Sequence, residues 1–292
     1  MEVSQLVQYT ITGLSTGSIY ALVAIGFVII YSVTGILNFA QGEFSMLGAL
    51  VTISLVKYGI PIILSIPLAI VFVAGIGLLI ERVTIYPSRD RLVLTLIILT
   101  IGLSALFRGL ALIIWGTNPH SLTLLPNIAP IQLFGAVLLP QAVFILIVLG
   151  ILLLILYWFF ERSYRGLALR ASEVNPQAAN LMGINTFSMS ALAFTLSAAV
   201  GALAGIMAAP MSEASYDMGF YIGLKGFIAM VIGGMNNIPG AVVGGLVLGL
   251  LEAFTGGLLS TTYSQAVSFI VLLLVLFVKP GGLWTRASGT RV

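Results

Sequence analysis

Carboxylate and amide side chains within apolar stretches are the groups of this sequence whose placement most needs a chemical reason. Glu252 lies in GGLVLGLLEAF, and Glu43 lies in LNFAQGEF close to Asn38 and Gln41. A lipid-facing carboxylate is costly, so both should face protein or water. For Glu252 a polar path, pairing between subunits and a structural hydrogen bond all stay open. For Glu43 we favour a pathway or packing role, and for Asn38 a local cap at a helix entrance. The candidate pathway residues are Asn38, Gln41, Glu43, Asn236, Asn237 and Glu252.

Catalysis on a substrate is not expected from this residue set. The sequence has no cysteine and a single histidine, His120, which excludes disulfides, thiolate chemistry and a His-cluster metal site. No nucleophile, histidine and acid are spaced as a catalytic set. The phosphate-binding pattern G-x-x-x-x-G-K-[ST] is also absent from the sequence, so the chain is not itself an ATPase. We therefore expect no catalytic residue, no metal and no cofactor.

The composition is that of a membrane protein. Charged residues make up 7% of the chain, against roughly 25% in a soluble domain. The hydrophobic share is 60% and the mean hydropathy is +1.16, so a water-soluble fold would expose a mostly apolar surface. The apolar runs, such as 138–160 and 267–278, are continuous rather than alternating, which favours helices over barrel strands. The predicted fold class is an all-α polytopic transmembrane bundle forming one domain over 1–292.

The number of spans follows from the length of the apolar runs, since a crossing needs about 20 such residues. Nine crossings are predicted, or eight if the short, Gly-rich 223–236 is re-entrant or half of a broken helix. The predicted spans are 6–33, 37–56, 61–81, 92–115, 138–160, 188–210, 223–236, 239–257 and 264–279.

Lysine and arginine predict the orientation of these spans. The segments 82–91 and 161–187 and the tail after 279 are basic, whereas 116–137 and 258–263 hold neither residue type. Nine crossings place the basic segments together, on the cytoplasmic side of a plasma membrane. The N-terminus then lies outside and the C-terminus inside. Lys57 and Lys225 fall on the outer side, against this rule. The polar outer segment 211–225 and the loop 116–137 are expected to be solvated or to dock a partner, and Arg108 is expected to snorkel.

Glycine recurs at spacings that bring helices together. Gly-x3-Gly pairs begin at Gly201, Gly240 and Gly245, and we expect dense packing within one subunit more than a seam between subunits. Gly35-x-x-Asn38 and Gly234-x-x-Asn237 also form a weak echo between the two halves of the chain. Many transporters are built from inverted repeats with broken helices, so this echo also predicts such a repeat here.

The segment 161–187, ERSYRGLALRASEVNPQAANLMGINTF, is the longest polar stretch and lies on the basic side. Ser172 or Asn175 is expected to cap a short helix with Pro176 in its first turn, and Gly183 to end it. An apolar stripe on that helix suits either the lipid headgroup layer or a cleft on a cytoplasmic partner. The stripe consists of Ala178, Ala179, Leu181 and Met182.

A resemblance to a known family favours the cleft on a cytoplasmic partner over the lipid headgroup layer. Gln177-Ala178-Ala179-x3-Gly183 is similar to the EAA-x3-G motif of ABC-importer permeases, with Gln in place of the usual Glu. The longer segments 17–49, 165–185, 223–254 and 274–284 resemble the permease family of branched-chain amino-acid ABC importers, in its shorter type. The likeness runs from about residue 10 to residue 285.

The resemblance implies an ABC-importer permease fold and a complex. Its partners would be a second related permease subunit, two cytoplasmic ATP-binding subunits and a periplasmic or extracytoplasmic binding protein. The implied function is to form half of the pathway for branched-chain or similar hydrophobic amino acids. A urea or short-amide permease and an ATP-independent secondary transporter or channel are the alternatives; the last predicts uptake that survives loss of the ATPase. The implied ATPase-coupling residues are Arg170, Glu173, Asn175, Pro176, Gln177, Ala178, Ala179 and Gly183.

Overall fold

A computed structural model describes residues 3–88, 91–125, 129–133, 135–279 and 281–284. A helix occupies each of the nine predicted spans, so the all-α prediction is confirmed apart from a small antiparallel hairpin, β1–β2. The elements in chain order are α1 (Val3–Thr34), α2 (Gln41–Lys57), α3 (Ile62–Ile80), the π-helical turn η1 (Glu81–Ile85), α4 (Tyr86–Ser88), α5 (Val93–Trp115), β1 (Ile131–Leu133), β2 (Ala136–Leu138), α6 (Pro140–Arg162), α7 (Tyr164–Val174), α8 (Pro176–Leu181), α9 (Thr186–Ser212), α10 (Met218–Gly233), α11 (Ile238–Leu258) and α12 (Thr261–Val278).

Length and hydropathy identify the membrane helices. Within the described residues, 6 helices are long and apolar enough to cross a bilayer, and α10 and α12 are shorter apolar helices. The outward faces of α3, α5 and α6 carry large apolar side chains, such as Val71, Ile113 and Leu154, which are 69%, 81% and 69% exposed. Water would disfavour such a surface, whereas hydrocarbon accepts it.

Close approach of helix backbones builds the core around α1. A Cβ added to Gly249 of α11 would lie 2.3 Å from the amide nitrogen of Gly17, and one added to Gly245 would lie 2.6 Å from that of Ala21. Only a residue without a side chain lets α1 and α11 meet this closely. Gly205 of α9 meets the Ser45 carbonyl of α2 in the same way. The predicted packing of the Gly-x3-Gly pairs within one subunit is confirmed.

Two turns in different halves of the chain begin in the same way. Gly35 and Gly234 follow α1 and α10 with φ of 68° and 113°, and each amide donates to a carbonyl four residues back at 2.8 Å. Asn38 Oδ1 then accepts from Ala40 N at 3.1 Å, and Asn237 Oδ1 accepts from Gly240 N at 3.2 Å. The two segments thus share a left-handed glycine after a helix, but only Asn237 is the N-cap of the next helix, whereas α2 has no side-chain cap. An inverted symmetry between the halves stays a prediction.

The segment 211–225 differs from the predicted outer loop. Helix α9 continues through Pro210 to Ser212, and α10 already begins at Met218, so only 213–217 is non-helical. Lys225 lies in the middle of α10, not in a loop. The loop prediction was wrong because it treated Lys225 as a solvated charge, whereas the folded chain gives it a partner inside the bundle.

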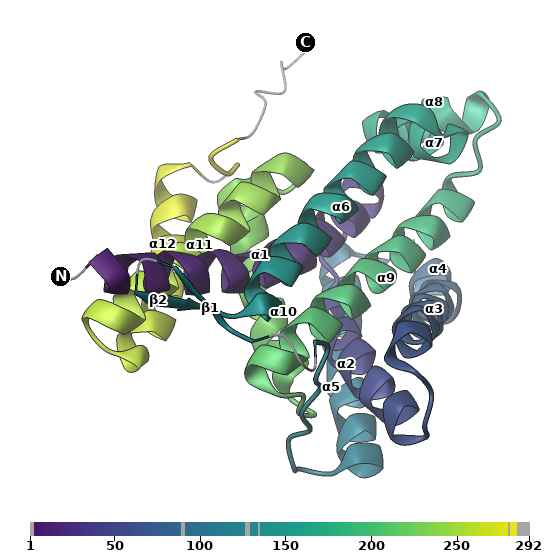
Figure 1. The fold of residues 1–292 in the computed structure, drawn as a ribbon. Helices are drawn as coiled ribbons and strands as arrows, with labels where there is room; N and C mark the ends of the chain where they lie inside the picture. Colours follow the sequence, from purple (N-terminus) through teal and green to yellow (C-terminus); the bar gives the residue numbers. More distant parts are fainter. Residues whose placement is uncertain (1–2, 89–90, 126–128, 134, 280, 285–292) are drawn as a thin grey trace.

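The polar segment between α6 and α9 forms a separate projection. Helices α7 and α8 lie beyond the end of α6 and the start of α9, at the upper right of Figure 1, away from the β1–β2 hairpin. The bundle thus carries its helical projection at the end away from the hairpin.

Candidate functional site

The projection formed by α7 and α8 is capped as the sequence predicts. Asn175 ends α7 and begins α8, and its Oδ1 accepts from Ala178 N at 3.0 Å. Pro176 occupies the first turn, where its missing N–H costs nothing. Of the two predicted caps, Asn175 is confirmed; Ser172 instead lies inside α7 and donates to the Ala168 carbonyl at 2.9 Å.

Gly183 ends α8, as predicted. Its φ is 84°, a left-handed conformation that glycine adopts without a Cβ penalty. The Ile184 amide returns to the Ala179 carbonyl at 3.0 Å and closes the turn. Asn180 Oδ1 then accepts from Thr186 Oγ1 at 3.1 Å, which ties α8 to the first residue of α9.

The predicted apolar stripe of α8 divides between two faces. Ala179 is 4% exposed and packs inward, whereas Leu181 and Met182 are 89% and 83% exposed. Val174, immediately before the shared cap, is 86% exposed. The projection therefore presents a group of uncovered apolar side chains at its tip, next to the exposed Gln177.

Charged groups join α7 to the end of α6. The Arg170 guanidinium donates to Glu161 Oε1 at 2.6 Å. Burial raises the pKa of the neighbouring Glu173 carboxyl, and Arg170 opposes this shift. The predicted coupling residues thus share one projection that is attached to both α6 and α9.

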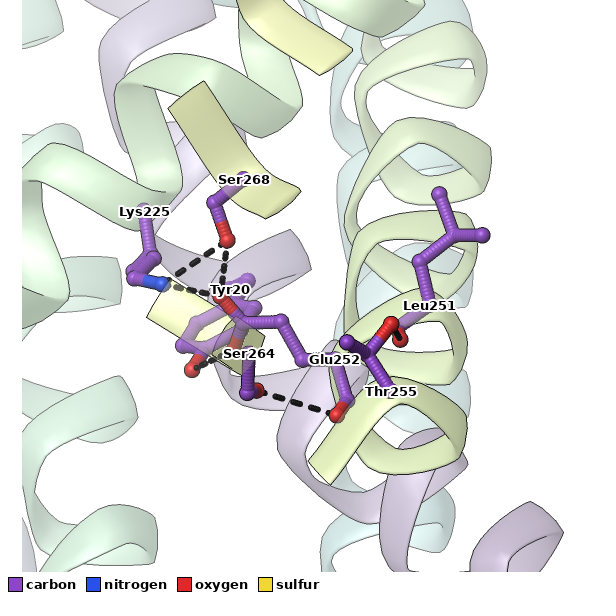
Figure 2. A network of polar contacts seen from close by, with 7 residues as sticks. All are labelled: Tyr20, Lys225, Leu251, Glu252, Thr255, Ser264 and Ser268. Atoms are coloured by element: carbon purple, nitrogen blue, oxygen red, sulfur yellow. Dashed lines mark hydrogen bonds and ion pairs between the residues drawn. The ribbon is translucent and has the colours of Figure 1, made fainter. Parts of the chain in front are cut away.

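Glu252 lies at the centre of a polar cluster that joins four helices (Figure 2). Its carboxylate accepts from Lys225 of α10 and Ser268 of α12, and from the Tyr20 hydroxyl of α1 at 2.8 Å. Ser264 Oγ also donates to the Glu252 backbone carbonyl at 3.0 Å. The side chains of Lys225 and Glu252 are 14% and 11% exposed. The carboxylate is therefore paired and hydrogen-bonded within the chain, which offsets the cost of its burial.

Sequence reasoning missed Lys225 as the partner of Glu252. A lysine inside the apolar run GFYIGLKGFIAM was itself a signal, because an ammonium group in lipid is nearly as costly as a carboxylate. The positive-inside rule asks only on which side of the membrane Lys225 lies, and it does not consider that the residue could lie inside the membrane.

Glu43 belongs to a second cluster, between α2 and α5. Its side chain is 1% exposed; Oε1 accepts from Ser104 Oγ at 2.7 Å and lies 3.5 Å from Arg108 Nε. The Arg108 guanidinium also lies over the Phe220 ring, 5.0 Å from its centroid. Among the described residues, Glu43 Oε2 accepts no hydrogen bond. Snorkelling of Arg108 stays a prediction, to which the structure adds the buried Glu43 carboxylate that α2 brings to it.

The other predicted pathway residues lie apart from Glu43. Gln41 is buried and exchanges hydrogen bonds with Ser197 of α9, at 3.2 Å from its Nε2 and 2.6 Å to its Oε1. Asn38 accepts from Ala40 N in the turn before α2 but does not cap the helix, whose start has no side-chain cap. Asn237 caps α11, and its Nδ2 donates to the Trp284 carbonyl at 3.0 Å, whereas Asn236 is exposed. The structure therefore distributes the six candidates over separate sites.

Two cavities lie along α5 and α10 beside the Glu43 cluster. One has a volume of about 390 Å³ and is lined by polar and aromatic side chains that include Arg108, Asp217 and Tyr216. The other, of about 270 Å³, is lined mainly by apolar side chains that include Phe39 and Phe227. Arg108 and Phe220 line both, so the two spaces meet at these residues.

The apolar helices of this bundle bury paired charges and hold cavities between them, and one end of the bundle carries a helical projection. This is the architecture of a transport permease. The family model for the branched-chain amino acid transport system permease component matches residues 9–276, and the chain belongs to this family.

Curated relatives agree with this assignment, and one solved structure shares the fold. The chain is 35% identical to the high-affinity branched-chain amino acid transport system permease protein LivH of Escherichia coli K12, over 98% of this chain and 97% of LivH. It is 32% identical to the corresponding protein BraD of Pseudomonas aeruginosa, over 100% and 99% of the two chains. The fold resembles PsaBC of Streptococcus pneumoniae, solved with a Fab, at a TM-score of 0.52 and 14% identity over 94% of this chain and 92% of that one.

Proposed function

We propose that this chain forms half of the translocation pathway of an ATP-driven, binding-protein-dependent importer of branched-chain or similar hydrophobic amino acids. The observation that carries the ATP-driven part is the capped projection α7–α8, whose tip exposes Leu181 and Met182. Large apolar side chains at the tip of a short helix suit insertion into a groove on a partner protein. The substrate class is supported by the near full-length likeness to LivH and BraD.

The proposed partners are two cytoplasmic ATP-binding subunits, a second homologous permease subunit and an extracytoplasmic binding protein. The chain lies in the plasma membrane with its N-terminus outside and its C-terminus inside. Energy comes from the separate ATPases, because the sequence lacks their phosphate-binding loop. The projection acts as the coupling segment of the single permease domain.

The connections of α8 explain how movement at the projection would reach the membrane. Arg170 holds α7 to Glu161 at the end of α6, and Asn180 holds α8 to Thr186 at the start of α9. When the ATPases close on ATP, the seated α8 moves with them and shifts α6 and α9 together. The bundle then alternates between outward and inward states, provided that the ATP-bound partner prefers one of them by several kcal/mol.

The test changes the exposed tip without changing the core. Leu181→Glu is expected to abolish co-purification of the ATPase and ATP-dependent leucine uptake in vesicles that contain the assembled complex. Tyr58→Glu is the matched control, since Tyr58 is 86% exposed at the far end of α2 and lies outside the projection. Bulky charged residues at the buried Ala179 and at the left-handed Gly183 should also abolish association, because they distort α8 itself. Unchanged ATPase association in these variants would show that the coupling assignment is wrong.

The competing hypothesis is an ATP-independent transporter or channel. It predicts that vesicles holding this chain alone take up leucine along a substrate or ion gradient. Uptake that requires the ATPase supports the importer, whereas uptake in its absence contradicts it.

A further inference from the structure

The cluster around Glu43 and Arg108 is incompletely satisfied, unlike the cluster around Glu252. Glu43 is 1% exposed, yet its Oε2 accepts no hydrogen bond from the described residues. This oxygen lies 2.5 Å from where a Cβ on Gly219 would stand. Gly219 and Ser104, the two neighbours of the Glu43 carboxylate, both line the 270 Å³ cavity. The Glu43 carboxylate therefore lies enclosed behind Gly219 and Ser104, and Glu43 itself lines neither cavity.

Charges of both signs line the cavity next to Glu43. Asp217, at the start of α10, lines the 390 Å³ cavity together with Arg108 and acts electrostatically on Glu43. Ser215 donates to Asp217 Oδ1 at 2.6 Å. Asp217 and Arg108 therefore place one charge of each sign on the wall of this cavity. The 3.5 Å separation between Arg108 Nε and Glu43 Oε1 is too long for a strong hydrogen bond, so the guanidinium is also available to a carboxylate ligand.

The two cavities differ in polarity on either side of Arg108. The charged groups and the tyrosines Tyr216 and Tyr221 line the larger space. Phe27, Phe39 and Phe227, with Ile101 and Leu224, line the smaller one. A ligand with a charged head and a compact apolar tail matches this division, because its tail leaves water while its head keeps ionic partners.

We propose that the groove between α5 and α10 is a contact site for a zwitterionic α-amino acid. The Arg108 guanidinium binds the ligand carboxylate, the Asp217 carboxylate binds its ammonium group, and the aliphatic side chain enters the phenylalanine-lined cavity. This inference rests on the proposed function, which it extends by naming the residues that touch the substrate. The network around Glu252 is a structural tie beside this site and does not form part of it.

Thiol protection tests the contact directly, because the sequence contains no cysteine. Ala105→Cys places a thiol on the wall of the larger cavity. Leu106→Cys is the matched control, one residue further along α5, 54% exposed and outside both cavities. The complex of permease and ATPase subunits in proteoliposomes is treated with a membrane-impermeant methanethiosulfonate. Labelling is expected at residue 105 and not at residue 106.

Ligand analogues then show which groups of the ligand the site recognises. Leucine is expected to slow labelling of Ala105→Cys, whereas 4-methylpentanoate, which lacks the ammonium group, and isoamylamine, which lacks the carboxylate, are not. Absence of labelling, or labelling that leucine leaves unchanged, overturns the site. Equal protection by all three compounds overturns the zwitterion assignment. The measurement needs no ATP hydrolysis, so a failure of ATP-dependent uptake would count against the proposed function and not against the groove.

A double variant separates substrate contact from structural pairing. Arg108→Gln is expected to lower leucine uptake by the complex about tenfold or more, the loss of a charge-assisted hydrogen bond. Arg108→Gln combined with Glu43→Gln removes both charges and keeps a neutral pair. If Arg108 contacts substrate, the double variant stays impaired. Recovery of uptake in the double variant, or no loss in the single one, overturns the assignment and makes Arg108 only the structural partner of Glu43.

Discussion

The Lys225 ammonium of α10 lies against the Glu252 carboxylate of α11, with the hydroxyls of Tyr20 and Ser268 on the same carboxylate. This pair joins two consecutive helices that the Gly234 turn separates, and it adds α1 and α12 through the two hydroxyls (Figure 2). Because both charges are mostly buried, neither is tolerated without the other. The pair is therefore a structural tie that holds the C-terminal helices to α1.

Glu252→Gln should strongly destabilise the chain, because it leaves the Lys225 ammonium buried without a counter-charge. The expected loss is about 3–5 kcal/mol. The double variant Lys225→Met with Glu252→Leu removes both charges and should be much closer to the parent. Unfolding of the detergent-solubilised protein measures both effects. A double variant as unstable as the sum of the two single variants would contradict a buried ion pair.

Gly249→Ala should also destabilise the bundle, for a steric reason. The new Cβ would lie 2.3 Å from the Gly17 amide nitrogen, so α1 and α11 must move apart. Overpacking of this kind costs about 1–3 kcal/mol. Gly75→Ala is the control, since a Cβ there meets nothing within 4 Å and alanine is the better helix former. The melting temperature in detergent should fall for the first variant and hold or rise for the second.

Gly183 should tolerate asparagine better than valine. Its φ of 84° is left-handed, and a Cβ at this position would meet no neighbouring atom within 4 Å, so only backbone strain opposes a substitution. That strain is about 1–2 kcal/mol for an ordinary residue and smaller for asparagine. Leucine-stimulated ATPase activity of the complex should therefore fall for Gly183→Val and remain near normal for Gly183→Asn. Equal activity in the two variants would argue that the end of α8 plays no part in coupling.

Single cysteines should reveal the orientation of the bundle. Tyr58 and Leu181 are 86% and 89% exposed, at opposite ends of the structure. An impermeant thiol reagent outside intact cells should label Tyr58→Cys at once and Leu181→Cys only after permeabilisation. The positive-inside pattern predicts this order. The reverse order would place the projection outside and remove its access to a cytoplasmic ATPase.

The sequence predicts the local features of this protein well, since they depend on neighbouring residues. The Asn175 cap, Pro176 in the first turn and the Gly183 terminus of α8 all follow from short-range hydrogen bonding and backbone preference. The loop prediction for 211–225 was wrong because Lys225 looked solvated until the fold supplied Glu252, 27 residues away.

In the candidate site, likewise, the sequence singles out one residue and only the fold identifies its partners. Glu43 stood out because a carboxylate in an apolar run needs an explanation. Its neighbours Ser104 and Arg108 lie one helical turn apart on α5, with Ser104 61 residues from Glu43 in the sequence, and Gly219 comes from α10. No periodicity or local motif links such positions, so Gln41, Asn38 and Asn237 were grouped with Glu43 although each has its own partners.

Composition and apolar run length alone determined that the chain is a helical membrane protein, because the cost of exposing backbone and apolar surface depends on the number of residues and not on their arrangement. Ordered local motifs determined the family and the form of the projection. Only the tertiary structure decided which buried charges meet: Lys225 with Glu252, and Arg108 with Glu43. Ion pairing acts over a few ångströms in space, and packing of distant helices sets those distances.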